Sequence, residues 1–386
     1  MSNQEWLLPM VETIMSESDS KGYHPEIKDQ WAYVPGMMLL SLLRVWEITQ
    51  DSKYYDYVKK HLELFIESDG SIRTYDLDEY NLDQINEGKV LLPLFKKTGE
   101  ERYAKSAQLL VDQLKSHPRT TDGGFWHKKI YPFQMWLDGL YMSSPFLAEY
   151  ANTFNKPELF DEVAHQLLTV EQRTRDPKTG LLYHGWDESK AEEWCNPATG
   201  TSFHFWSRAM GWYAMAIVDS LEHFPRNHVK RGTIAGIFLR MVAALEKVQD
   251  SESGLWYQVL DQEKREGNYL EASGSCMFVY AIAKGVRLGY LPRYYRKLAV
   301  KGFEGLLEHL VTQDAAGVHL HQICKGAGLG NRPYRDGSYT YYINETVVSD
   351  QFIGQAPFIL AGVEMERLKS VPEGTVGDSG KNQLVF

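Results

Sequence analysis

The stretch Gly88-Lys89-Val90-Leu91-Leu92 begins an apolar segment that a short polar turn, Thr98-Gly99-Glu100, separates from a second segment. The second segment, Tyr103 to Leu114, repeats its apolar residues at the spacing of one helical face. The stretch therefore predicts a helical pair. An apolar helix needs contacts on most sides and an amphipathic helix packs one face, so we expect an inner helix covered by an outer helix.

The same pattern recurs along the chain and indicates a repeat architecture. An earlier copy runs from Gly36 through Trp46 to a turn at 49–52 and an amphipathic segment over 54–65. Further copies begin at Gly139, Gly211, Gly274 and, in truncated form, Gly354. A single helical pair cannot bury both of its faces, so the six copies are expected to pack against one another as one domain.

A second, shorter repeat follows the outer helices. It consists of a glycine, a few apolar or aromatic residues, and a polar residue four positions after the glycine. The polar residues are Lys128, His184, Gln258 and His321, and a weaker fifth copy ends at Arg73. Equivalent loops of a toroid gather at one end, so these side chains are expected to point to a common place.

Six helical pairs with their loops at one end predict an all-α fold, an (α/α)6 barrel with a single funnel. The barrel is expected over residues 1–370 as one domain, followed by a polar C-terminal tail over 371–386. An open helical solenoid is the alternative, and the irregular spacing of the copies disfavours it.

Composition narrows the class of protein. The 386 residues carry 41 Lys and Arg against 51 Asp and Glu, a net charge of -10, which argues against a nucleic-acid partner. No apolar run approaches the roughly 20 residues of a membrane span, and the start of the chain lacks the pattern of a secretory signal. With only three scattered cysteines, a reducing cytoplasm is the expected location. The 10 Trp and 23 Tyr favour a carbohydrate site, because sugars bind well to aromatic rings with polar edges.

No motif for a nucleotide or metal cofactor is present. The spacing His319-x-His321-x-x-Cys324 could be interpreted as a metal cluster. The glycine-loop repeat already accounts for His321, however, and no fourth ligand is near in the sequence. The sequence therefore predicts no metal and no cofactor.

Asp138 is the best candidate for a catalytic acid. It stands at the start of the third inner helix among Trp136, Leu137, Leu140 and Met142. Apolar surroundings raise the pKa of a carboxyl group and suit it to donate a proton. The alternative is a helix N-cap, a favoured position for Asp.

Asp83 occupies a comparable place at the start of the second inner helix. Neighbouring inner helices of a toroid would place both carboxylates at the same rim, where two acids can divide proton transfer and positioning between them. An N-cap role is an equally good interpretation of Asp83.

The fourth inner helix begins with Trp206, Arg208 and Trp212. An Arg beside aromatic rings suits an anionic sugar, because its guanidinium can pair with a carboxylate through two hydrogen bonds. The alternative is that Arg208 forms a surface salt bridge and that the two tryptophans belong to the core. His127, Lys128 and His184 add donor or cationic groups from the loops.

Several blocks resemble glycoside hydrolase family 105, and among its members the unsaturated rhamnogalacturonyl hydrolases. The most specific block runs from Tyr131 through Met135-Trp136-Leu137-Asp138-Gly139 to Met142, and weaker motifs extend from Trp31 to Ala361. The resemblance implies Asp138 as general acid and base and Asp83 as a second functional carboxylate. It implies the following substrate-binding residues: Tyr33, His127, Lys128, Trp136, His184, Trp206, Arg208 and Trp212.

The reaction implied by this resemblance is a hydration. The substrate is an oligosaccharide ending in a 4,5-unsaturated uronic acid, the product of a polysaccharide lyase acting on pectin. Water adds across the double bond, and the hemiketal that forms collapses to release the next sugar, here expected to be rhamnose. The two-carboxylate schemes of ordinary glycosidases do not apply.

Three other functions fit parts of the sequence. An unsaturated glucuronyl hydrolase would act on a different lyase product with the same acid. A sugar epimerase on a similar toroid would use histidines such as His184 and His321 to move protons. A binding or scaffold protein would need the tryptophans but no acid.

Overall fold

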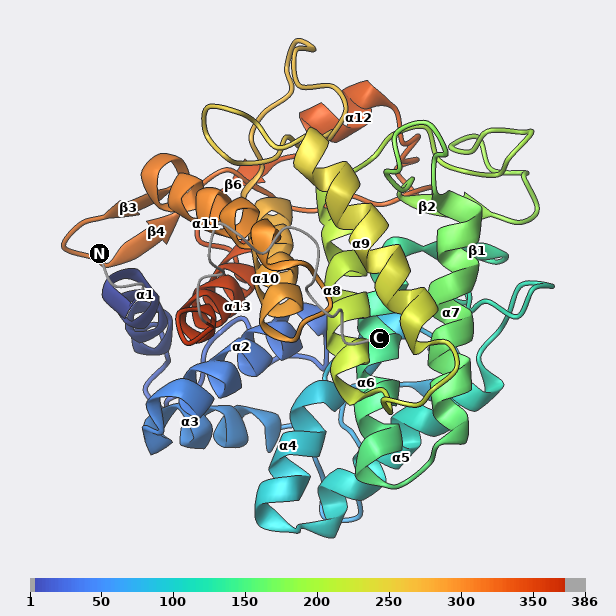
Figure 1. Ribbon diagram of the computed structural model, residues 1–386. Helices are drawn as coiled ribbons and strands as arrows, with labels where there is room; N and C mark the ends of the chain where they lie inside the picture. The colour runs from blue at the N-terminus through green and yellow to red at the C-terminus, as the bar shows by residue number, and fades with distance from the viewer. Residues whose placement is uncertain (1–3, 372–386) are drawn as a thin grey trace.

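The computed structural model describes residues 4–371. Within this range, six inner helices form a ring and an outer helix covers each of them (Figure 1). The inner helices are α2 (Tyr33–Thr49), α4 (Gly88–Thr98), α6 (Leu137–Thr153), α8 (Ser207–His223), α10 (Ala272–Arg287) and α13 (Phe352–Leu368). The outer helices are α3 (Ser52–Leu62), α5 (Glu101–Ser116), α7 (Glu158–Thr174), α9 (Arg231–Lys247), α11 (Arg296–Gly305) and α1 (Gln4–Ser16). The (α/α)6 barrel expected from the repeat is confirmed.

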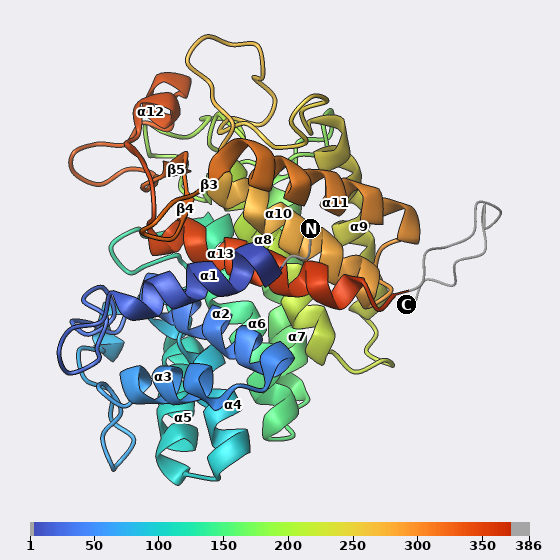
Figure 2. The ribbon, with the colours of Figure 1, turned by 90° about the vertical axis from the view of Figure 1, so that its left-hand side faces the viewer.

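Packing of α13 against α2 closes the ring and excludes an open solenoid. The sixth outer position is filled from the other end of the chain, because α1 packs against α13 (Figure 2). The copy that begins at Gly354 therefore looks truncated in the sequence because its outer helix precedes all the others.

The glycines that begin the repeat allow the inner helices to approach one another closely. A Cβ atom on Gly88 would lie 2.3 Å from the ring of Phe146 on α6, and one on Gly211 would lie 2.8 Å from Met277 on α10. Any larger side chain at these positions would push neighbouring helices apart. The recurrence of glycine in the sequence thus has a packing cause.

Short elements join the loops where the inner helices begin. The antiparallel pairs are β1 (Gln134–Trp136) with β2 (Gly185–Asp187), β3 (Val311–Gln313) with β4 (Val318–Leu320), and β5 (Ile323–Cys324) with β6 (Val347–Val348). Helix α12 (Tyr339–Asn344), 3-10 turns at Leu77–Glu79, Leu82–Ile85 and Arg293–Tyr295, and a wide helical turn at Leu306–Leu310 complete the elements. In β1–β2, Trp136 lies opposite Gly185, so the loop that leads to Asp138 is tied to the loop that carries His184.

None of the helices between residues 4 and 371 has the length and apolar character needed to cross a lipid bilayer. The polar tail expected over 371–386 lies, apart from its first residue, outside the described residues. The division into one domain over 1–370 and a tail therefore stays a prediction.

Candidate active site

Asp138 is the second residue of α6, and its side chain is 13% exposed. The N-cap position is occupied by Trp136, whose side chain makes no capping hydrogen bond. The alternative interpretation of Asp138 as an N-cap is therefore wrong. Its Oδ2 atom lies 3.2 Å from Nε2 of His184, within ion-pair distance, although the two groups are not aligned for a regular hydrogen bond.

The expectation of a raised pKa at Asp138 is wrong in direction. Burial raises the pKa of this carboxyl group, but His184, with smaller contributions from His127 and the backbone, opposes it, and together they make the net shift downward. The carboxyl group of Asp138 is therefore ionised at neutral pH. The apolar sequence neighbours of Asp138 do bury it, but His184, from a loop 46 positions later in the chain, is the main group that makes the pKa shift downward.

His184 is fully buried and held from two sides. Its Nδ1 atom lies 2.8 Å from the hydroxyl oxygen of Tyr342 on α12. Its carbonyl oxygen accepts the backbone N–H of Leu137, the first residue of α6, at 3.0 Å. The imidazole is thus fixed beside the acid by both its own backbone and a distant helix.

Asp83 lies in the 3-10 turn Leu82–Ile85, just before α4 rather than at its start. The cap of this turn is Asn81, whose side chain accepts the N–H of Asp83 at 3.0 Å, so the cap interpretation of Asp83 is wrong as well. Lys128 Nζ lies 2.5 Å from Asp83 Oδ2, and His127 Nε2 lies 3.7 Å from Oδ1. A backbone bridge between Asn81 and Lys128 holds the two segments in register.

The charges around Asp83 are unequal. Burial lowers the pKa of Lys128, but Asp83 and Tyr131 together raise it and the net shift is upward, so the amine keeps its proton. Burial lowers the pKa of His127 to about 4, against a smaller raising effect of Asp83, so this imidazole is neutral near pH 7. The second carboxylate therefore faces one cation and one neutral donor or acceptor.

Aromatic rings form a wall that joins the two acids. Trp136 stacks on His127 with 4.5 Å between ring centroids and lies 5.6 Å from the ring of His184. Trp206 lies 4.8 Å from His184 on another side and donates its indole N–H to Gln258 Oε1 at 3.0 Å. Both tryptophans therefore contact the residues that surround the acids.

Arg208 is 2% exposed, so its interpretation as part of a surface salt bridge is wrong. Its guanidinium lies over the ring of Trp206 and donates to Ser273 Oγ at 3.2 Å and to the carbonyl oxygen of Cys324 at 2.5 Å. Within residues 4–371, no carboxylate oxygen lies within 4 Å of this guanidinium; Glu271 is connected to it through Ser273. Such a buried cation can accept an anionic ligand.

Tyr33 and Trp212 lie together beside this cation. Tyr33 begins α2, and its ring meets that of Trp212 edge to face at 6.1 Å. Burial and the charge of Asp83 raise the pKa of Tyr33, while Arg208 opposes them. Trp212 also stacks on Tyr141 at 5.0 Å, so it belongs partly to the barrel core.

Three of the four equivalent loop residues converge as expected. Lys128 reaches Asp83, His184 reaches Asp138, and Gln258 reaches Trp206. His321 does not join them, because its ring nitrogens pair with the hydroxyls of Thr312 and Ser349, each at 2.8 Å.

The spacing around His319 does not build a metal cluster. His319 pairs with Asp314 and Asp350, while Cys324 Sγ accepts Gln258 Nε2 at 3.2 Å. In the part of the chain that the structure describes, no group of three His, Cys, Asp or Glu side chains is placed to hold a metal ion.

The sequence interpretation missed two residues of the site. Tyr342 lies in the aromatic run from Tyr339 to Tyr342, which no repeat marks. Glu271 is fully buried, caps α10 and accepts the backbone N–H groups of Ser273 and Cys324 at 3.0 Å each. A carboxylate directly before the Ala272-Ser273-Gly274 helix start was the available signal for Glu271.

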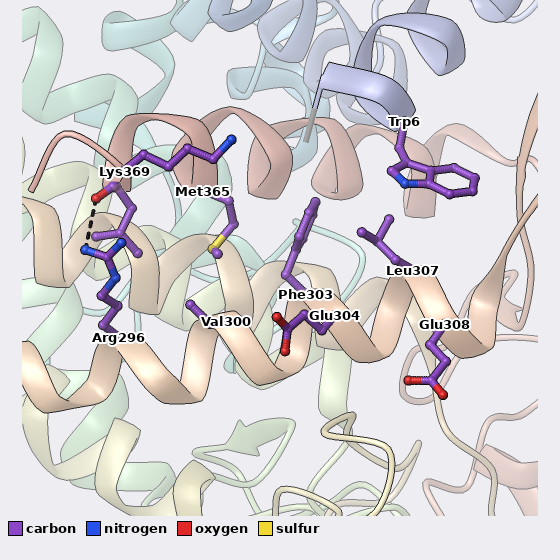
Figure 3. Close-up of a pocket in the computed structure, with 10 residues that line it drawn as sticks. Trp6, Arg296, Val300, Phe303, Glu304, Leu307, Glu308, Met365 and Lys369 are labelled. Atoms are coloured by element: carbon purple, nitrogen blue, oxygen red, sulfur yellow. Dashed lines mark hydrogen bonds between the residues drawn. The ribbon is translucent and has the colours of Figure 1, made fainter. Parts of the chain in front are cut away.

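A pocket of about 590 Å³ lies outside the barrel, between α1, α11 and α13. Figure 3 shows Trp6, Phe303 and Met365 along it, with Arg296 and Lys369 at one end. No candidate site residue lines this pocket, so it is separate from the cluster around Asp138.

Comparisons with known proteins agree with this arrangement. The family model described as Glycosyl Hydrolase Family 88 matches residues 6–369. A solved glycoside hydrolase from family 105 of C. acetobutylicum ATCC 824 is 46% identical, with a TM-score of 0.90 over 94% of this chain and 100% of that chain.

Two curated relatives match parts of the chain. Protein Atu3128 of Agrobacterium fabrum is 39% identical over 58% of this chain and 97% of its own length. The unsaturated rhamnogalacturonyl hydrolase YesR of Bacillus subtilis is 28% identical over 72% of this chain and 76% of its own length. By its family model and its solved relative, the chain belongs to Glycosyl Hydrolase Family 88, groups with family 105 and is a glycosidase.

Proposed function

We propose that this glycosidase removes a 4,5-unsaturated galacturonic acid from the non-reducing end of rhamnogalacturonan oligosaccharides. The observation that carries the proposal is that an acid and a buried cation, Asp138 and Arg208, lie in the same site. Asp138 lies beside His184, and Arg208, within electrostatic range of Asp138 and Glu271, forms no direct ion pair in the described chain. An anionic sugar ring bound between them supplies the missing carboxylate.

Asp138 acts as the general acid and then the general base of a hydration. Its proton adds to C4 of the enol ether, and the positive charge that develops is shared by C5 and the ring oxygen. Water attacks C5 and gives a proton back to Asp138. The resulting hemiketal opens to a ketone, and the hemiacetal left at C1 expels the next sugar with its oxygen.

Asp138 must be protonated before it can act as an acid, and we expect substrate binding to promote this protonation. In the free site, His184 holds the pKa of Asp138 below its ordinary value. A uronate ring brings its own negative charge and excludes water, and both effects raise the pKa of a nearby carboxyl group. The bound sugar therefore shifts Asp138 toward its proton-donating form.

The other residues bind and orient the ring. Arg208 pairs with the carboxylate at C5, because a guanidinium matches a carboxylate with two parallel hydrogen bonds. Asp83, held by Lys128, accepts hydrogen bonds from ring hydroxyls, and Trp136 and Trp206 supply apolar faces. These roles require no metal or organic cofactor.

Rhamnose as the sugar beneath the unsaturated residue is supported by the similarity to the unsaturated rhamnogalacturonyl hydrolase of Bacillus subtilis. It would place the protein in pectin degradation, on products that a lyase has made. A cytoplasmic location stays a prediction, with which the three unpaired, buried cysteines are compatible.

The experiment is turnover of lyase-generated oligosaccharides, followed through the absorbance of the conjugated double bond. Absorbance is expected to fall with unsaturated rhamnogalacturonan disaccharide, and turnover in heavy water is expected to place one deuterium at C4. A faster loss of absorbance with an unsaturated glucuronyl disaccharide would show that the substrate is a different lyase product, while the hydration mechanism would still hold. Release of sugar without deuterium at C4 would overturn the hydration.

Asp138→Asn separates an enzyme from a mere binder. Loss of the acid is expected to lower kcat about 100- to 10,000-fold, the usual range for one general acid or base, while the Kd for the oligosaccharide stays within a few-fold. Asp161→Asn, at a 77% exposed surface position, is the matched control. Undiminished kcat in Asp138→Asn would refute the assignment and would favour a different acid or an epimerase.

A further inference from the structure

Arg335 is a second cation without a carboxylate partner near the site. It is half-buried, and no carboxylate oxygen among residues 4–371 lies within 4 Å of its guanidinium. Its donors go to uncharged oxygens, namely the carbonyls of Leu329 and Gly330 at 3.0 and 2.8 Å and the hydroxyl of Tyr131 at 3.0 Å. These bonds orient the guanidinium but leave its charge uncompensated.

Arg335 lies beside the aromatic rings that border the candidate active site. Its guanidinium carbon lies 5.7 Å from the ring centroid of Trp136 and 5.8 Å from that of Tyr131. Trp136 is the ring whose centroid lies 5.6 Å from His184, the neighbour of Asp138. The cation is therefore separated from the reacting end of the site by about the width of one indole.

The loop that carries Arg335 is unusually basic for this chain. Residues 325–335 contain Lys325, Arg332 and Arg335 and no acid, in a protein whose net charge is -10. Lys128 lies close enough for the charge of Arg335 to lower its pKa. A local positive field of this kind attracts an anionic ligand.

Two acids adjoin this loop, namely Glu192 and Asp336, which directly follows Arg335 and accepts the backbone N–H of Ser338 at 2.9 Å. Glu192 accepts the hydroxyl of Tyr334 at 3.0 Å and the side-chain amide of Gln134 at 3.2 Å. It forms no ion pair with Arg335 in the described chain. The positive charge of Arg335 is therefore not neutralised by a direct ion pair within the described chain, and it is available to an anionic ligand.

We propose that Arg335, with the hydroxyl of Tyr131, forms a second anionic subsite that binds the carboxylate of the next uronic acid along the oligosaccharide. Arg208 holds the carboxylate of the unsaturated ring, and Arg335 holds that of a ring beyond the bond that is broken. The enzyme is then selective for chains in which uronic acids recur, and it prefers a tetrasaccharide to a disaccharide. This inference rests on the proposed function.

The test compares three substrates with the full-length protein. They are the unsaturated disaccharide, the unsaturated tetrasaccharide with its second uronic acid, and the same tetrasaccharide with that second carboxyl group reduced to an alcohol. In the wild type, KM is expected to be at least about tenfold lower for the intact tetrasaccharide than for the other two, the size of one charge-assisted hydrogen-bonded contact. Because this comparison changes only the substrate, it does not depend on the folding of a variant.

Arg335→Gln is expected to erase that preference, and Arg335→Lys to restore part of it. Arg332→Gln removes the same charge from an exposed position of the same loop and is the matched control, with a KM change below about twofold. Equal KM values for intact and reduced tetrasaccharide in the wild type would overturn the subsite. So would equal effects of Arg335→Gln and Arg332→Gln.

Two further outcomes are separable. An Arg335→Gln effect on a rhamnose-sulfated disaccharide but not on the tetrasaccharide would overturn the carboxylate assignment in favour of a sulfate. Absence of turnover of both the disaccharide and the tetrasaccharide by the wild type would instead refute the proposed function.

Discussion

Nδ1 of His184 lies 2.8 Å from the hydroxyl oxygen of Tyr342, although the two residues are 158 positions apart. Both side chains are fully buried, and the ring of Tyr342 also stacks at 6.1 Å on Trp206. With Nδ1 occupied, Nε2 of the imidazole is the nitrogen that faces Asp138. A residue near the end of the described chain therefore sets the orientation of the group that controls the acid.

Tyr342→Phe is expected to lower kcat/KM about tenfold, mainly through kcat, because the imidazole loses the hydrogen bond that orients it. Tyr341→Phe is the matched control, since the Tyr341 hydroxyl accepts the N–H of Gly328 and does not touch His184. A purely structural role of Tyr342 would change stability but leave the pH profile of kcat/KM unmoved. Equal rates in the two variants would contradict the positioning role.

His184→Gln is expected to move the alkaline limb of the kcat/KM profile to higher pH. His184 is the main group that lowers the pKa of Asp138, so a neutral amide in its place allows the acid to keep its proton further up the pH scale. His321→Gln, which lies outside the site, should leave the limb where it is. A limb that stays in place in His184→Gln would show that another group limits the reaction.

Much of the fold could be predicted because helical pairs are encoded locally. Periodicity marks each pair, and the glycine near the start of each inner helix marks where neighbours approach, as Gly88 does against Phe146. The outer helix α1 could not be predicted as the partner of α13, because the pairing joins opposite ends of the chain.

The site was predictable only where a repeat or a motif carries it. Asp138, Asp83, Lys128 and His184 converge because equivalent loops meet at one end of the barrel. The direction of the pKa shift at Asp138 was not predictable, because it depends on a contact between loops rather than on sequence neighbours. Tyr342 lies in the short helix α12 and Arg335 in a loop, and in neither does a periodic pattern specify which side chain turns inward.

Lys284→Met is expected to destabilise the protein by about 3–5 kcal/mol without changing kcat. The amine is almost fully buried and lies 2.7 Å from both Asp219 and the more exposed Glu222, so its removal leaves the buried carboxylate of Asp219 uncompensated. Lys115→Met is the matched control, because its pair with Asp112 is exposed and should cost less than about 1 kcal/mol. Urea unfolding measures both values, and similar losses in the two variants would refute the role of burial.

His61 is expected to make the protein less stable as the pH falls from 7 to 5. Its buried ring donates from Nδ1 to the carbonyl of Tyr57 and accepts the N–H of His24 at Nε2, each at 2.8 Å, so only the neutral form satisfies both bonds. Burial lowers its pKa to about 4, whereas the unfolded chain binds a proton near the ordinary value of about 6.5. Between these values the unfolded state holds more protons, so the free energy of unfolding decreases as the pH decreases, by about 2 kcal/mol at pH 5 for this residue.

His61→Gln removes that contribution, so the loss of unfolding free energy between pH 7 and 5 should be smaller by about this amount than in the wild type. An identical loss in both proteins would mean that His61 is already protonated in the folded state or does not titrate in this range.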